Sequence, residues 1–160
     1  MPDSSLLLML DEVRTMSLRV LEEVTDDESR WTPPGLANSI RWHAGHIYVV
    51  VERLTLEPLD REPIVPTGWI NLFGWESRPA ETPAEQYPPL AEIVGQLQSQ
   101  HARLRAMLAE LSEAELSQPL AERPDRTARH LILHGFQDEA AHKGEIWLLR
   151  KLFARRGAGA

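Results

Sequence analysis

Four long stretches of the sequence repeat apolar residues every three or four positions, and this periodicity constrains the fold more than any other feature. They cover about residues 4–24, 38–54, 90–111 and 127–155. An apolar stripe with this spacing predicts an amphipathic helix that buries one face, while residues such as Arg14 fill the polar face. No stretch shows a strand signal, so the sequence predicts an all-α four-helix bundle.

Capping residues and linkers refine this prediction. Ser4 or Ser5 can cap the first helix, Asn38 or Ser39 the second, and Thr127 the last. The linkers after the second and third helices are long enough for a crossover connection, so a simple up-and-down order is not required. The last four residues of the sequence are expected to fray.

The composition suits one soluble domain that spans residues 1–160. Hydrophobic residues make up 42% of the chain and charged residues 26%, and the formal net charge is −7. Because no basic run stands out, we expect neither nucleic acid nor an anionic membrane as a partner. The absence of cysteine excludes disulfides, a thiolate metal site and a cysteine nucleophile.

The first residues give no targeting or membrane signal. The apolar run at residues 6–10 is too short to span a bilayer, and it lacks a basic flank and a small-residue cleavage site. We therefore expect a mature cytoplasmic protein.

The stretch 57–89 loses the helical period and predicts a long loop between the second and third helices. It holds seven prolines, two glycines and four aromatic residues, namely Trp69, Phe73, Trp75 and Tyr87. A loop this long in a compact domain is usually functional or mobile. Its aromatic side chains need apolar surroundings, either as the wall of a pocket at one end of the bundle or against a second subunit.

The last helix places a carboxylate and an imidazole on its apolar face. Asp138 and His142 are four residues apart, so they stack on one side of a helix. Burying both groups is costly unless something pairs with them. A salt bridge between the two is one solution and a divalent metal ion is the other. Gly135 lies on the same stripe, where its missing side chain leaves room for another helix or a ligand.

A metal ion would need a third ligand, and the second helix offers His43 and His46 on or beside its core stripe. Helix bundles build metal sites from inward side chains on facing helices. The helical wheel favours His43 as the more inward of the two. Two imidazoles and one carboxylate with open positions suit ferrous iron and tolerate manganese, cobalt, nickel or zinc. Such an open site is of the catalytic type, whereas structural zinc sites are normally closed.

The other ionisable residues on these helices have simpler explanations. His101 is expected to be a hydrogen-bonded core or rim histidine, and His134 to lie near the site or at the surface. Glu52 and Glu145 are expected to be solvated. Glu139 is expected to be a surface or hydrogen-bonding residue, with a general base as its alternative role.

Two segments together resemble the DinB-like superfamily: Ser39–Ile47, which contains a Gly-His pair, and Gln137–Ile146. The resemblance implies a four-helix bundle with a metal site made from one histidine of helix two and two of the last helix. Carried over by position, the ligands are His46, Asp138 and His142. Relatives usually have histidine in place of Asp138. The carboxylate either gives the site a harder donor than imidazole and lowers its net charge by one, or it marks a site that has lost its metal.

The resemblance also implies a range of functions. It selects His46 over His43 as the helix-two ligand and a divalent ion (Zn, Ni, Fe or Mn) as the cofactor. Relatives include thiol-dependent transferases and isomerases, iron-binding sulfoxide synthases and stress-associated proteins without a known activity. We expect a metal-dependent transferase or hydrolase that acts on a small molecule, with a low-molecular-weight thiol as co-substrate.

The alternative is a non-catalytic, stress-associated protein. In that case Asp138 and His142 form a buried ion pair, and the chain dimerises through an apolar bundle face and the Trp69–Trp75 loop. Either function is compatible with a homodimer, which we expect.

Overall fold

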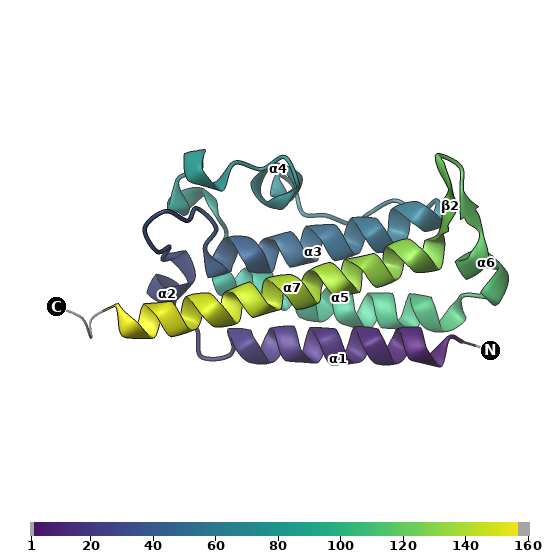
Figure 1. The fold of residues 1–160 in the computed structure, drawn as a ribbon, viewed down its shortest axis with the longest axis horizontal. Coiled ribbons are helices and arrows are strands. Elements are labelled where there is room, and N and C mark those ends of the chain that lie inside the picture. Colours follow the sequence, from purple (N-terminus) through teal and green to yellow (C-terminus); the bar gives the residue numbers. More distant parts are fainter. Residues whose placement is uncertain (1, 157–160) are drawn as a thin grey trace.

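Four long helices form the bundle that the sequence predicts. The computed structural model describes residues 2–156, so the expected fraying of residues 157–160 lies outside the described part. The long helices are α1 (Ser4–Leu21), α3 (Ile40–Leu56), α5 (Leu90–Glu110) and α7 (Ala128–Arg155) (Figure 1). The predicted all-α fold is confirmed. None of the helices among residues 2–156 is long and apolar enough to cross a membrane.

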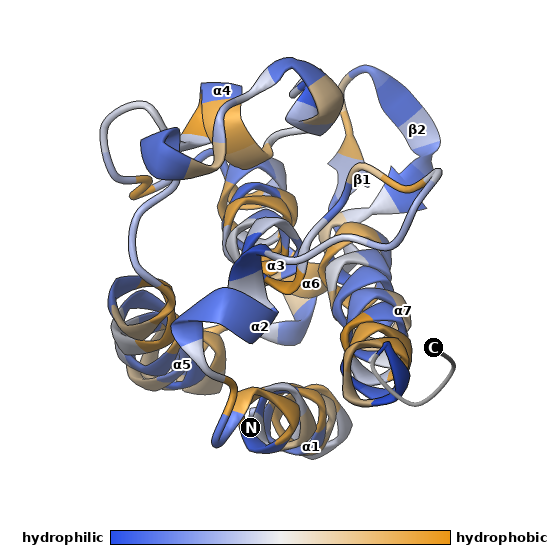
Figure 2. Cartoon of the chain, turned by 90° about the vertical axis from the view of Figure 1, so that its left-hand side faces the viewer, coloured by the Kyte–Doolittle hydropathy of each residue, from blue (hydrophilic) through white to orange (hydrophobic). Residues whose placement is uncertain are grey.

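The helices are not joined in simple up-and-down order. α3 and α1 each pack against both α5 and α7, so α1 and α3 lie diagonally opposite (Figure 2). α1 and α7 run in one direction, since Asp3 bonds Arg129 at their starts and Val20 bonds Arg150 near their ends. α3 and α5 run in the other direction (Figure 1). Residues 57–89 therefore form the crossover connection that the linker length permits.

The connections contain short elements. These are α2 (Asp26–Arg30), η1 (Glu57–Leu59), α4 (Trp69–Phe73), η2 (Pro79–Glu81), η3 (Ala84–Gln86), α6 (Glu113–Ser117), β1 (Pro119–Leu120) and β2 (Arg123–Thr127). The two strands pair antiparallel. This hairpin was not predicted, and the expectation of no strand is wrong at this point. Its strands are short, carry a proline each and do not alternate polar with apolar residues, so the sequence gives no strand signal.

Side-chain caps fix the starts of the helices that matter for the site. Ser39 accepts a hydrogen bond from the backbone N–H of Trp42, and Thr127 caps α7 in the same way. Both capping predictions are confirmed. The prediction for α1 is wrong by one position, because Asp3, rather than one of the two serines that follow, accepts the free N–H groups. An acidic cap is also favourable for the helix dipole.

Most aromatic residues of the long connection pack inside the chain. Trp69, Phe73 and Tyr87 are at most 8% exposed, and α4 lies over the outer side of α3 (Figure 2). Trp75 differs, since it is 52% exposed and stacks under the guanidinium of Arg53. The connection is therefore anchored to the bundle by three of its four aromatic side chains.

A largely buried network of charged and polar side chains crosses the middle of the bundle. Its members, here called the buried network, are Arg14, Glu52, Gln100, Arg103 and Glu139. Arg14 makes two hydrogen bonds to the Glu139 carboxylate, of 2.8 and 3.0 Å, and both side chains are fully buried. Gln100 links this pair to Glu52, which Arg103 also contacts at 2.6 Å.

The buried network corrects two predictions and decides a third. The sequence places Arg14 on the polar face and predicts a solvated Glu52, yet both side chains are fully buried. Of the two roles predicted for Glu139, at the surface or as a hydrogen-bonding residue, the second is observed, because Glu139 is fully buried and accepts hydrogen bonds from Arg14. The burial of all three is tolerated because each charge has an opposite partner and further hydrogen bonds. The partners come from different helices, so the periodicity of one segment cannot reveal them.

Candidate metal centre

The three predicted ligands meet where α3 packs against α7. Nε2 of His46 lies 3.9 Å from Oδ2 of Asp138, and Nε2 of His142 lies 3.6 Å from the same oxygen. The three donor atoms lie within 4.8 Å of one another. We call these three residues the donor cluster. Two donors that each bind one ion at about 2.0–2.2 Å lie up to about 4 Å apart. The distances of the two imidazole nitrogens from Oδ2 of Asp138 are therefore short enough for one shared ion.

Asp138 carries the most informative atom of the donor cluster. Its Oδ2 is buried and has no hydrogen-bond partner among the described residues. The two imidazole nitrogens face it at distances too long for a hydrogen bond. A buried carboxylate oxygen without a partner is costly. This arrangement favours a bound cation over the directly hydrogen-bonded ion pair that the sequence also allowed.

His46 is held with its Nε2 toward Asp138. Its Nδ1 lies 2.5 Å from the carbonyl oxygen of Phe73, which can only accept, so Nδ1 carries the proton and Nε2 keeps its lone pair. Trp42 stacks on the imidazole with ring centroids 4.6 Å apart and covers one face of the site. Metal-binding histidines characteristically donate a hydrogen bond from the N–H of their second ring nitrogen in this way.

Gly45 allows the contact between Phe73 and His46. A Cβ atom at position 45 would lie 2.3–2.5 Å from the ring of Phe73, so only glycine lets α4 approach α3 this closely. Gly135 has a similar role on α7, since a Cβ there would meet Leu54 at 3.3 Å. Of the two uses predicted for Gly135, the close approach of another helix is the one observed.

The Nδ1 atom of His142 has two polar neighbours. It lies 2.7 Å from Oε2 of Glu145 and 2.9 Å from Nδ1 of His43. Nδ1 of His43 lies 3.1 Å from the same Glu145 oxygen. His43, His142 and Glu145 form a second cluster that also satisfies the distance requirement for a metal site. Glu145 was expected to be solvated; its side chain is 55% exposed but engaged with both histidines.

The structure distinguishes His43 from His46 by the carboxylate that each of them faces. Both are only 4% exposed, so the helical wheel correctly marks His43 as inward but does not exclude His46. His46 faces Asp138, whereas His43 faces Glu145. Burial lowers the pKa of His43 to about 3, helped by the neighbouring His142 and His46. Burial also lowers the pKa of His46, so both rings are neutral at pH 7, the form that can bind a metal.

The remaining histidines lie outside the donor cluster. His101 is a rim residue that bonds Asp11 at 2.8 Å, as expected. His134 is exposed one turn before Asp138, also as expected. Neither Lys nor Arg forms an ion pair with Asp138 or Glu145 within residues 2–156. The two carboxylates therefore leave a charge that a divalent ion could balance.

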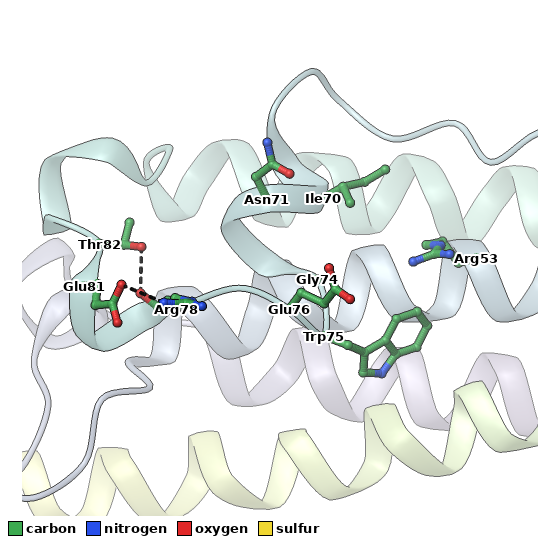
Figure 3. A pocket seen from close by; sticks show the side chains of 9 residues that line it. All are labelled: Arg53, Ile70, Asn71, Gly74, Trp75, Glu76, Arg78, Glu81 and Thr82. Carbon is green, nitrogen blue, oxygen red and sulfur yellow. Dashed lines mark hydrogen bonds and ion pairs between the residues drawn. The ribbon is translucent and has the colours of Figure 1, made fainter.

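Two pockets flank the outer side of α3, and none of the donor-cluster residues lines either one. The first, of about 520 Å³, has Arg53 and Trp75 at one end and Arg78, Glu81 and Thr82 at the other (Figure 3). The second, of about 790 Å³, shares Arg53 and Trp75 and reaches His134 on α7. His134 brings this pocket within one helical turn of Asp138.

Comparison with known proteins agrees with the fold. The sequence matches the DinB superfamily over residues 9–146, and the chain belongs to this superfamily. A crystal structure of a conserved protein from Enterococcus faecalis is similar, with a TM-score of 0.77 and 19% identity over 95% of this chain and 97% of the other. At that identity the likeness shows the fold alone. The comparison with curated proteins gives no match.

Proposed function

We propose that the protein binds one divalent metal ion through His46, Asp138 and His142 and uses it in a hydrolytic or group-transfer reaction on a small molecule. The observation that carries the proposal is the buried, unpartnered Oδ2 of Asp138. It faces two imidazole nitrogens, each on a ring whose other nitrogen has a hydrogen-bond partner. The chain belongs to the DinB superfamily, and the resemblance of its two segments to that superfamily implies ligands at the same three positions.

The donor set fits a divalent ion. Two neutral imidazoles and one carboxylate suit zinc, nickel, iron or manganese, and three protein ligands leave positions for other ligands. The replacement of the family's usual histidine by Asp138 is compatible with metal binding, because a carboxylate binds all four of these ions. Asp138 also adds a negative charge beside a second carboxylate, Glu145, which favours a dication over a neutral ligand.

A bound ion would supply Lewis-acid chemistry, polarising a substrate oxygen or lowering the pKa of a bound water or thiol. The chain contributes the positioning. The Phe73 carbonyl orients His46, and Trp42 shields one face of that imidazole from water. The side chains of Asp138 and His142 are 26% and 17% exposed, which leaves the donor cluster open on the α7 side. A low-molecular-weight thiol as co-substrate stays a prediction.

Metal binding is tested by titrating the purified, chelator-treated protein with Zn²⁺, Ni²⁺, Fe²⁺ and Mn²⁺ in a calorimeter. We expect one ion per chain for at least one of these metals, and an increase in melting temperature, since a ligand of the folded state stabilises it. Asp138→Ala and His142→Ala are expected to abolish binding. His134→Ala, an exposed histidine one turn away, is the matched control. Full metal occupancy in both site variants would contradict the proposal.

A second candidate, the non-catalytic bundle protein, rests on the 3.6 Å distance between His142 and Asp138, which is within ion-pair range. It predicts that no divalent metal changes the melting temperature of the wild-type protein. The homodimer and the cytoplasmic location stay predictions under both proposals, and gel filtration with light scattering tests the former.

A further inference from the structure

His142 belongs to two groups of potential ligands, which raises the question of which nitrogen binds the metal. Its Nε2 faces Asp138 and His46, while its Nδ1 faces Glu145 and His43. A neutral imidazole carries a proton on one nitrogen and a lone pair on the other. It therefore cannot ligate an ion on both sides without losing its one N–H proton.

The distances distinguish the two sides of the ring. On the Nδ1 side, the 2.7 Å contact with Glu145 is a hydrogen bond in length, and the carboxylate can only accept. Nδ1 of His142 therefore carries the proton, and its N–H donates a hydrogen bond to Glu145. On the Nε2 side, the 3.6 Å separation from Asp138 is too long for a hydrogen bond. The lone pair of His142 thus faces the donor cluster.

His43 completes the arrangement from the neighbouring helix. It is 4% exposed, and its Nδ1 lies 2.9 Å from Nδ1 of His142 and 3.1 Å from the Glu145 oxygen. The carboxylate of Glu145 thus contacts one histidine from α7 and one from α3. Trp42 packs edge-on against the His43 ring, with centroids 5.2 Å apart, and limits its movement.

We propose that Glu145 and His43 are positioning residues that orient His142 for metal binding, and that the second cluster is not a second metal site. The inference rests on the proposed function. A carboxylate on the second nitrogen of a metal-binding histidine fixes the ring orientation and raises its basicity, and its loss typically lowers metal affinity 10–100-fold. Glu145 has the geometry for this role through its contact with His142.

Substitution of Glu145 tests the positioning role. We expect Glu145→Ala to weaken metal binding 10–100-fold in a calorimetric titration, and Glu145→Gln to weaken it less, because the amide oxygen still accepts a hydrogen bond. The melting temperature of the metal-free protein should not change by more than about 2 °C, since the Glu145 side chain is 55% exposed. Glu92→Ala, which removes an exposed carboxylate on α5, is the control and should leave the affinity unchanged.

Substitution of His43 tests the stoichiometry. The wild-type protein and His43→Ala should both bind one ion per chain, with weaker affinity in the variant. Two ions in the wild type and one in His43→Ala would overturn the inference and make the second cluster a metal site. Equal affinity in wild type and Glu145→Ala would overturn the positioning role alone. A wild-type protein that binds no ion would overturn the proposed function, and the inference with it.

Discussion

Adjacent residues of α7 belong to two polar clusters with opposite properties. Glu139 is part of the buried network, where it makes two hydrogen bonds to Arg14. Asp138 is part of the donor cluster, where its Oδ2 has no hydrogen-bond partner among the described residues. Both clusters place carboxylates inside a helix bundle, but only the first satisfies them with protein groups. The first cluster thus joins helices through protein groups alone, whereas under the proposed function a metal ion completes the second.

The largest expected loss of stability comes from removing a charged side chain of the buried network. Arg14→Ala leaves Glu139 buried without its cation, and removal of one partner of a buried ion pair typically costs about 3–5 kcal/mol. Urea denaturation should show a loss of that size. Arg105→Ala, which removes a half-exposed partner of Asp11, should cost less than about 1 kcal/mol. Equal losses in the free energy of unfolding would mean that burial does not determine how much each ion pair contributes to stability.

A second prediction concerns Gly45, which allows α4 of the long connection to approach α3 beside the donor cluster. Gly45→Ala places a Cβ against the Phe73 ring and should cost about 1–3 kcal/mol through overpacking. It should also weaken metal binding, because the Phe73 carbonyl moves away from His46. Gly95→Ala is the control, since a Cβ there meets nothing within 4 Å, and it should be neutral or stabilising. Undiminished metal affinity in Gly45→Ala would show that Phe73 does not position His46.

Buried His43, beside the donor cluster, should also make the metal-free protein sensitive to acid. The pKa of His43 is lowered by burial to about 3, from about 6.5 in the unfolded chain. Between these values the unfolded state binds more protons, so the free energy of unfolding falls as the pH is lowered, by about 1.4 kcal/mol per pH unit for this group. Urea denaturation from pH 7 to 5 with chelator present measures the slope. His43→Gln should reduce this slope. An unchanged slope would contradict the conclusion that the lowered pKa of His43 causes the loss of stability in acid.

The smallest effect is expected from neutralising the unsatisfied carboxylate. In metal-free protein, Asp138→Asn should change the free energy of unfolding by less than about 1 kcal/mol, or should increase it, because a buried charge without a partner is removed. The same substitution should weaken metal binding strongly. A loss of several kcal/mol without metal would mean that Asp138 has a structural partner, as Glu139 does.

The sequence predicts the bundle and much of the candidate site, for identifiable reasons. The spacing of Asp138 and His142 within one helix is local information, so the pattern indicates that they share a face. The choice of His46 over His43 required the family resemblance, because both lie on the inner side of α3. The bundle itself follows from apolar periodicity, which is also local to each segment.

Most of the missed features depend on contacts between distant segments. The burial of Glu139 requires Arg14, 125 positions away, and that of Glu52 requires Gln100 and Arg103 on α5. The orientation of His46 depends on a backbone carbonyl, which carries no sequence signature beyond the glycine that lets it approach. The Glu145 contact lies within one helical turn of His142, and its i, i+3 spacing is a signal that sequence reasoning could have used.

The most direct test of the account is a crystal structure of the protein soaked with Zn²⁺ or Mn²⁺, with anomalous data collected at the metal edge. The account predicts one anomalous peak per chain, at about 2.0–2.2 Å from Nε2 of His46, Nε2 of His142 and a carboxylate oxygen of Asp138. It also predicts that the 2.7 Å contact between His142 and Glu145 is retained. A peak between His43 and Glu145, or no peak at full metal saturation, would contradict it.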